Sequence, residues 1–305
     1  MDDNPNMAIP VVGAAGNVGR GVVEAFKKEG WEVLPIDPVI NKTFDKLSDK
    51  EFRKIFISAR IAIYTADCGN RDEYTRNMGL ERENNERFCL FCKKVLDVNP
   101  NLTIWYIGGS WTKRKPNAKW EVNDNSANKD LKDCNLYEKA KISAEKNAQK
   151  LSRKTRIRFV DWPSIVPNLA PNFSITKMVI QAVEEGEISY SPGELGRPLA
   201  DSVEAGEGMV ALIKNDDQDK RFKKYLIPGS FISFTDFAQT VKGVVEAKTK
   251  KHIKLTEIEN SPDFLKSKCK SDYLESNGFC VSRKRTLSAL CKNAEAVWLS
   301  CYTTF

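Results

Sequence analysis

A run of glycines near the start of the chain restricts the fold more than any other feature of the sequence. Gly13, Gly16 and Gly19 lie between an apolar run at residues 8–12 and a segment at 19–29 with apolar side chains at helical spacing. Glycines here allow a tight turn, a close approach of the backbone to a pyrophosphate, and packing of the next helix on the strand. A helix N-terminus also offers free N–H groups to phosphates. The sequence therefore predicts a strand, a phosphate-binding loop and a helix.

Strand-like and helix-like segments alternate through the first half of the chain. Further strands are predicted at residues 31–36, 61–65, 102–107 and 157–160, and helices at 50–58, 83–95 and 137–151. This alternation predicts a parallel sheet with helices on both faces. Pro10 cannot donate into a sheet ladder, so the first strand must begin there or tolerate a gap. We expect an α/β fold with a Rossmann doubly wound parallel sheet, built by residues 1–165 and a returning segment near 222–247.

The second half of the chain has a different character, because prolines interrupt it repeatedly. These prolines are Pro163, Pro167, Pro171, Pro192 and Pro198. Helices are predicted at residues 175–185, 203–213 and 234–247, and short strands at 225–227 and 253–255. We expect residues 166–305 to form mainly a smaller, loop-rich C-terminal substrate domain. The last 45 residues show no clear pattern, and no internal repeat is found.

Asp37 stands at the end of the second predicted strand, 18 residues after Gly19. At this place a dinucleotide-binding fold presents a carboxylate to the hydroxyls of the adenosine ribose. A carboxylate there repels a 2′-phosphate, so the residue predicts NAD as the cofactor, with NADP as the alternative. Another interpretation makes Asp37 a turn residue before Pro38, since Asp-Pro pairs often begin turns.

Tyr137 and Lys141 are four residues apart and lie on one face of a predicted helix. Tyrosine is a weak acid, with an ordinary pKa of about 10. A lysine one turn away favours the phenolate and can hold a ribose, so the tyrosine could exchange a proton with a substrate oxygen while a cofactor moves a hydride. The alternative interpretation is an ordinary solvated helix face.

Taken together, the glycine loop, Asp37, Ser110, Tyr137 and Lys141 resemble the extended short-chain dehydrogenase/reductase family. This family includes nucleotide-sugar epimerases, dehydratases and ketoreductases, and the resemblance covers about residues 8–245. It implies reversible hydride transfer between NAD and a secondary alcohol or ketone of a nucleotide sugar or similar small molecule. In this interpretation Tyr137 is the general acid/base, Lys141 supports it and binds ribose, and Ser110 positions the reacting oxygen.

The resemblance also implies two sets of binding residues. The cofactor set is Gly13, Gly16, Asn17, Val18, Gly19, Asp37, Tyr137, Lys141, Pro163 and Val166. The substrate set is Ser110, Thr112, Asn168 and Arg197. The chain departs from the family pattern at residues 41–54, which form an unusually short third-strand region, and at Gly108 and Gly109, which replace the usual serines. Trp162 takes the place of a frequent asparagine, which puts an ordinary uridine-sugar substrate in doubt.

Two other functions remain open at this point. The first is reduction of a ketone on a non-sugar natural product, which the Trp162 departure favours. The second is a dinucleotide-binding regulatory protein without turnover. The family pattern also predicts a homodimer through the helices at 83–95 and 137–151. The apolar side chains Phe88, Leu90, Phe91 and Val95 suggest this interface, although a buried helix explains them equally well.

Composition and charge argue against several classes of protein. The net charge of +7 is spread over lysines interleaved with acids, so we expect no nucleic-acid partner. No apolar run reaches about 18 residues, and the polar N-terminus lacks the pattern of a secretory signal, so we expect no membrane span. Cys89 and Cys92 are far from the sole histidine, His252, so we expect no metal site. The eight cysteines suggest thiols in a reducing compartment and therefore a cytoplasmic protein.

Overall fold

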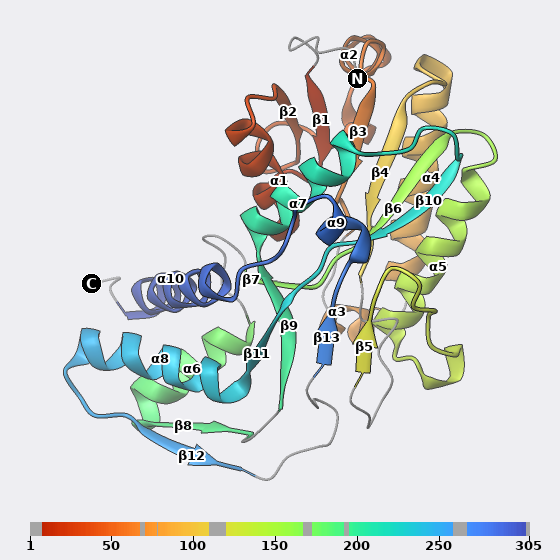
Figure 1. Cartoon of the computed structure of the whole chain (residues 1–305). Coiled ribbons are helices and arrows are strands. Elements are labelled where there is room, and N and C mark those ends of the chain that lie inside the picture. Colours follow the sequence, from red (N-terminus) through yellow and green to blue (C-terminus); the bar gives the residue numbers. More distant parts are fainter. Residues whose placement is uncertain are drawn as a thin grey trace.

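A parallel sheet of six strands forms the centre of the molecule (Figure 1). The computed structural model describes residues 8–67, 71–77, 79–109, 120–166, 173–191, 195–258 and 267–302. Within these ranges the sheet consists of β1 (Ile9–Val12), β2 (Val33–Ile36), β3 (Ile61–Tyr64), β4 (Thr103–Ile107), β6 (Arg156–Asp161) and β10 (Phe222–Leu226). Every pairing in it is parallel. The predicted α/β fold with a parallel sheet is therefore confirmed.

Helices cover both faces of this sheet, as the alternation of segments predicted. They are α1 (Asn17–Lys28), α2 (Asp49–Phe56), α3 (Arg71–Arg76), α4 (Leu80–Val98), α5 (Leu136–Leu151) and α7 (Ser202–Lys214). One buried cluster, which includes Trp105 of β4, joins α1 and α7 to one face. A second cluster joins α2, α4 and α5 to the other face, through Tyr106 and its neighbours. Adjacent residues of one strand thus serve opposite cores, as the pleat requires. None of the described helices is long and apolar enough to cross a bilayer.

The strand order differs from that of the usual dinucleotide-binding sheet. In that sheet the third strand of the chain pairs with the outer side of the second strand. From one edge the order is β2-β1-β3-β4-β6-β10, so β2 is the edge strand and the order reverses between β1 and β3. Between β2 and α2 the chain forms only a short 3-10 helix, η1 (Phe44–Lys46), in a stretch that is described throughout. The short segment at 41–54 is therefore the physical reason that the sheet ends at β2. Ligands of open α/β sheets bind at such a reversal, at the carboxyl ends of the strands.

Pro10 lies inside β1, so of the two predicted outcomes the strand tolerates a gap rather than beginning at Pro10. The amides of Ile9 and Gly13 donate to the β2 side of the strand, so the intervening Pro10 faces β3. The paired residues of β1 and β3 begin only at Val11 and Ile63, which leaves Pro10 outside that register. Its missing N–H therefore costs no hydrogen bond in the ladder.

The second half of the chain builds small sheets and a helical layer beside the central sheet. The strands are β5 (Trp120–Val122), β7 (Ser164–Val166), β8 (Glu187–Tyr190), β9 (Gly196–Asp201), β11 (Ser230–Ser233), β12 (Lys254–Glu257) and β13 (Ser267–Cys269). The helical elements are η3 (Leu131–Asp133), α6 (Phe173–Glu185), α8 (Phe234–Thr249), α9 (Asp272–Ser276) and α10 (Arg283–Tyr302). Helices α6, α8 and α10 share a third buried core with β9 and β11. The division at residue 165 stays a prediction.

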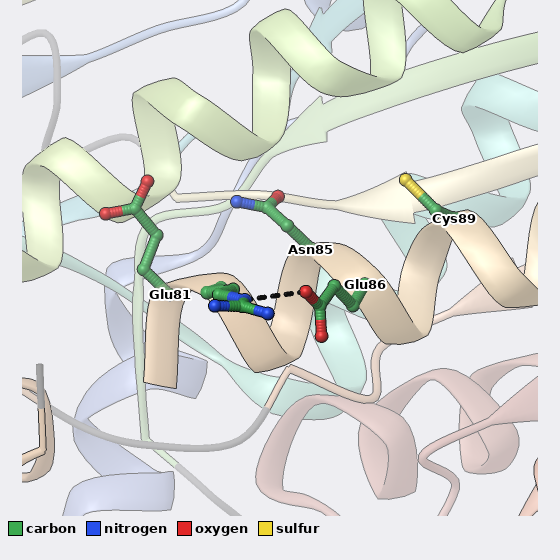
Figure 2. Close-up of a pocket in the computed structure, with 5 residues that line it drawn as sticks. Glu81, Asn85, Glu86 and Cys89 are labelled. Atoms are coloured by element: carbon green, nitrogen blue, oxygen red, sulfur yellow. Dashed lines mark hydrogen bonds and ion pairs between the residues drawn. The ribbon is translucent and has the colours of Figure 1, made fainter. Parts of the chain in front are cut away.

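The outer surface of α4 bears on the predicted homodimer. Phe88, Phe91 and Val95 are buried in the chain's own core, whereas Leu90 is exposed. Figure 2 shows a hollow on this helix lined by polar and charged side chains: Glu81, Arg82, Asn85, Glu86 and Cys89. Three of the four apolar side chains that suggested an interface therefore stabilise the monomer instead. The homodimer itself stays a prediction.

Candidate active site

The glycine loop begins where β1 ends, and two of its glycines have no room for a side chain. Gly13 has φ +85°, and a Cβ there would lie 2.7 Å from Thr65 Oγ1 and 2.8 Å from the amide nitrogen of Ala66. A Cβ on Gly19 would lie 2.1 Å from the carbonyl oxygen of Gly13. Both contacts involve backbone atoms that cannot move cheaply. These glycines therefore allow the loop to fold tightly at the end of β1. This is the place in the sheet where the strand order reverses between β1 and β3.

Helix α1 begins directly after this loop. Its N-cap is Gly16, and no side-chain cap is found there in the described chain. The first turn contains no acidic residue, so Asn17 and Val18 present their backbone at a helix end that carries a partial positive charge. Such an end is suited to bind a phosphate.

Asp37 connects the end of β2 to the glycine loop. Only 7% of this residue is exposed. Its Oδ2 accepts a hydrogen bond from the amide of Ala15 at 3.1 Å, and its Oδ1 accepts one from the amide of Val39 at 2.9 Å. The second bond is the local turn that the Asp-Pro pair suggested. Asp37 therefore stabilises both its own turn and the loop, and each oxygen keeps a further lone pair for a ligand.

Tyr137 and Lys141 lie at the start of α5. The helix begins with a capping box, in which Asn135 and Glu138 each accept a hydrogen bond from the other's amide at 2.9 and 3.0 Å. Lys141 is buried and Tyr137 is half-buried. The Lys141 ammonium lies 5.5 Å from the centre of the Tyr137 ring. The two side chains thus share one face of the helix.

The Tyr137 hydroxyl lies next to the end of β4. A Cβ on Gly109 would come 3.5 Å from this hydroxyl and 3.8 Å from Lys141 Cγ. Gly109 therefore leaves the phenol space at the carboxyl edge of the sheet. Three predicted site residues, Ser110, Thr112 and Asn168, lie outside the described residues.

The structure adds Asp67, which the sequence analysis did not select. Its Oδ2 lies 2.7 Å from Lys141 Nζ, and only 11% and 8% of the two side chains are exposed. The Tyr106 hydroxyl donates to the same oxygen at 2.5 Å. Burial alone would lower the pKa of Lys141, but the Asp67 carboxylate, with Tyr137 and Tyr74, raises that pKa above its ordinary value. Asp67 follows β3 at the carboxyl edge of the sheet, and that position is the signal that could have identified it.

Tyr74 of α3 completes the surroundings of Tyr137 and Lys141. Its ring contacts the Tyr137 ring edge-on, with the centroids 5.5 Å apart. Its hydroxyl accepts a hydrogen bond from Asn84 Nδ2 at 2.8 Å. Burial raises the pKa of Tyr74 to about 12, so it is a neutral phenol at physiological pH. We infer that Tyr74 orients the Tyr137 ring through this contact.

The remaining predicted residues lie in the second half of the chain. Pro163 and Val166 are buried, and Val166 belongs to the third core, so neither side chain faces an open surface. The Arg197 guanidinium of β9 lies 5.2 Å from the centre of the Phe237 ring of α8. Burial lowers the pKa of Arg197 to about 10. Contacts of these three residues with a cofactor or substrate stay predictions.

Comparison with known proteins gives matches among solved structures alone, since no family model and no curated protein matches the sequence. The UDP-glucose 4-epimerase from Bifidobacterium longum, in complex with NAD+ and UDP, superposes with a TM-score of 0.72 at 14% identity, over 98% of this chain and 100% of that chain. RMD from Pseudomonas aeruginosa, complexed with NADPH, gives 0.70 at 12% identity, over 95% and 100% of the two chains. The UDP-glucose 4-epimerase from Thermotoga maritima, with UDP-glucose, gives 0.68 at 13% identity, over 96% and 99%. The chain therefore has the fold of these enzymes, an α/β fold with a parallel sheet, as its motifs predicted.

Proposed function

We propose that this protein is an NAD(H)-dependent oxidoreductase or epimerase that moves a hydride to or from a secondary alcohol or ketone carbon of a nucleotide sugar or similar metabolite. One observation carries the proposal: three consecutive residues after β3 join the glycine loop to the Tyr137–Lys141 pair. Thr65 Oγ1 donates to the carbonyl of Gly13 at 2.9 Å, and Asp67 binds Lys141. The phosphate-binding loop and the acid/base pair are therefore parts of one edge of the sheet.

The residues of this edge fit a dinucleotide. The side-chain-free surface at Gly13 and Gly19 and the open start of α1 suit a pyrophosphate. Asp37 can accept hydrogen bonds from the adenosine ribose. Next to it, the apolar side chains of Val39 and Ile40 are 78% and 52% exposed, and an adenine ring would cover such a surface. When bound, the cofactor gives or takes a hydride at C4 of its nicotinamide.

The chain's own residues then have distinct tasks. Tyr137 gives its hydroxyl proton to the substrate oxygen during reduction, and as the phenolate it takes the proton of the substrate hydroxyl during oxidation. The buried Lys141 ammonium favours the phenolate and donates to the nicotinamide ribose. Ser110 orients the reacting oxygen, with Thr112, Asn168 and Arg197 as further substrate contacts.

Cofactor preference is the first testable consequence. NAD(H) should bind more tightly than NADP(H), because the Asp37 carboxylate repels a 2′-phosphate. Lys42, a basic candidate for binding that phosphate, pairs with Glu51 at 3.0 Å. Calorimetric titration with both cofactors measures the preference, and Asp37→Ser should reduce it. NADP(H) binding tenfold more tightly, about 1.4 kcal/mol, would contradict the assignment.

The reaction is tested by steady-state oxidation and reduction of the dinucleotide with a panel of nucleotide sugars and non-sugar ketones. Turnover or epimerisation of a nucleotide sugar is the expected result. Turnover confined to non-sugar ketones would favour the second candidate function, which rests on the bulky Trp162, only 3% exposed, that follows β6. Tight cofactor binding without turnover would point to a regulatory protein instead.

The assembly and the compartment belong to the same proposal. We infer a homodimer in the cytoplasm, and the described cysteines are free thiols, which suits a reducing compartment. Light scattering at working concentration should return twice the mass of the 34.5 kDa chain. A monomer under those conditions would refute the dimer.

A further inference from the structure

Asp67 occupies a position that links both halves of the proposed active site. It lies two residues after Thr65, whose hydroxyl donates to the carbonyl of Gly13 in the glycine loop, and its carboxylate contacts Lys141 across 74 residues of sequence. We propose that Asp67 is a positioning residue, which holds the Lys141 ammonium where it would bind the nicotinamide ribose of the cofactor. This inference rests on the proposed function, which it extends by one residue.

The hydrogen bonds of Asp67 explain how it could orient the lysine without blocking it. Oδ2 accepts from both Lys141 Nζ and the Tyr106 hydroxyl, and Tyr106 is held in the core with only 1% exposed. An ammonium has three N–H donors, so two remain for other acceptors. Lys141 is thus tied to a rigid element and still free to bind a hydroxyl.

The second carboxylate oxygen points to a ligand. Oδ1 of Asp67 is buried and has no hydrogen-bond partner among the described residues. A buried acceptor without a donor costs about 1–3 kcal/mol, so a group that donates there gains affinity. A ribose hydroxyl can donate to this oxygen while it accepts from Lys141. The Asp67–Lys141 pair therefore offers one acceptor and one donor to the same sugar.

The charge of Asp67 matters for the protonation of Lys141, because Lys141 is buried and its other described titratable neighbours are tyrosines. The titratable groups around it in the described chain are Asp67 after β3, Tyr74 of α3 and Tyr137 of α5, and Tyr106 of β4 donates to Asp67. Burial raises the pKa of Tyr74 and of Tyr106, so both are neutral phenols near neutral pH. Asp67 then supplies the negative charge that opposes desolvation. Without it, burial would lower the pKa of Lys141 and the ammonium would lose its proton as the pH rises.

The test is Asp67→Asn, which removes the negative charge of the side chain and keeps its shape. The pH titration of Lys141, followed by NMR in carbon-13 lysine-labelled protein without cofactor, should move to lower pH in the variant. NADH affinity of the wild type should stay constant from about pH 7 to about pH 10, whereas that of Asp67→Asn should fall by roughly tenfold or more over this range. A structural role alone would change stability without moving either pH dependence.

The same helix provides a matched control. Glu138 pairs with Lys129 at 2.7 Å, and each side chain is 8% exposed, so this pair equals Asp67–Lys141 in length and is close to it in burial. Glu138→Gln removes a buried carboxylate but keeps a residue that completes the capping box. It should lower stability and leave the Lys141 titration unchanged.

Three results would overturn the proposal. The first is a Lys141 titration in Asp67→Asn that equals the wild type. The second is tighter NADH binding by Asp67→Asn, which would mean that Asp67 competes with the ribose for Lys141. The third is a wild-type NADH affinity that falls between about pH 7 and about pH 10, a measurement that remains available if the variant does not fold. A wild type that binds no NAD(H) would refute the proposed function, whereas the Lys141 titration would still judge the pairing.

Discussion

Replacing Tyr137 with phenylalanine should lower turnover by about 10²–10⁴-fold, the usual contribution of a positioned acid/base. The ring and its edge-on contact with Tyr74 remain, so the packing at the start of α5 should not change. Cofactor affinity should survive, since the glycine loop and Asp37 lie on other elements. Steady-state turnover and calorimetric titration with NAD(H) measure the two effects separately.

Two further variants sharpen this test. Lys141→Met should weaken both turnover and cofactor binding, and its effect should not add to that of Tyr137→Phe, because the two residues act as one unit. Tyr190→Phe removes a phenol from β8, where the hydroxyl contacts Glu257, and should leave turnover unchanged. If Tyr137→Phe keeps near wild-type turnover on the true substrate, Tyr137 is not the acid/base. The spacing of Tyr137 and Lys141 on one helix face would then be a coincidence.

The parts of this site that could be predicted are those that local sequence determines. The glycine spacing specifies a loop because backbone contacts exclude any side chain at Gly13 and Gly19. Asp37 and the Tyr137–Lys141 pair follow from their place at the end of a strand and on one face of a helix. Strands and helices were recognisable because apolar side chains repeat with the period of each element.

The parts that could not be predicted depend on contacts between distant segments. Asp67 and Lys141 are 74 residues apart, and no local pattern shows that the end of β3 meets α5. The strand order depends on which strands become neighbours, so the shortness of residues 41–54 was visible but its consequence for the sheet was not. Helix α10 packs against α6 and α8. Its buried side chains Leu290, Ala294 and Val297 recur at helical spacing, but the sequence does not show which elements they meet.

Arg158 is the clearest case of such a distant contact. The sequence placed it in a strand, and the structure buries it completely in β6 with 0% exposed. Its Nε donates to both oxygens of Asp216 at 2.7 and 2.8 Å, and its two terminal nitrogens donate to the carbonyls of Lys220 and Asp217 at 2.9 Å each. One side chain thus holds the whole connection between α7 and β10 against the central sheet.

Arg158→Met should therefore lower the free energy of unfolding by about 3–5 kcal/mol, because it leaves the Asp216 carboxylate buried without its cation. Urea unfolding measures this loss. Lys214→Met is the control. Lys214 is the last residue of α7 and forms an ion pair with Glu29, in which the two side chains are 51% and 38% exposed. An exposed pair of this kind contributes about 0–1 kcal/mol.

The double variant Arg158→Met with Asp216→Leu separates charge from packing. Two apolar side chains can replace a buried ion pair at little cost, so the double variant should recover much of the stability that the single variant loses. Tyr225 limits the recovery, because its hydroxyl donates to Asp216 at 2.5 Å and would lose its acceptor. The double variant could instead be less stable than Arg158→Met alone. That result would mean that Tyr225 and the connection between α7 and β10 stabilise the Asp216 carboxylate more than Arg158 does. The connection would then be held by Asp216 rather than by Arg158.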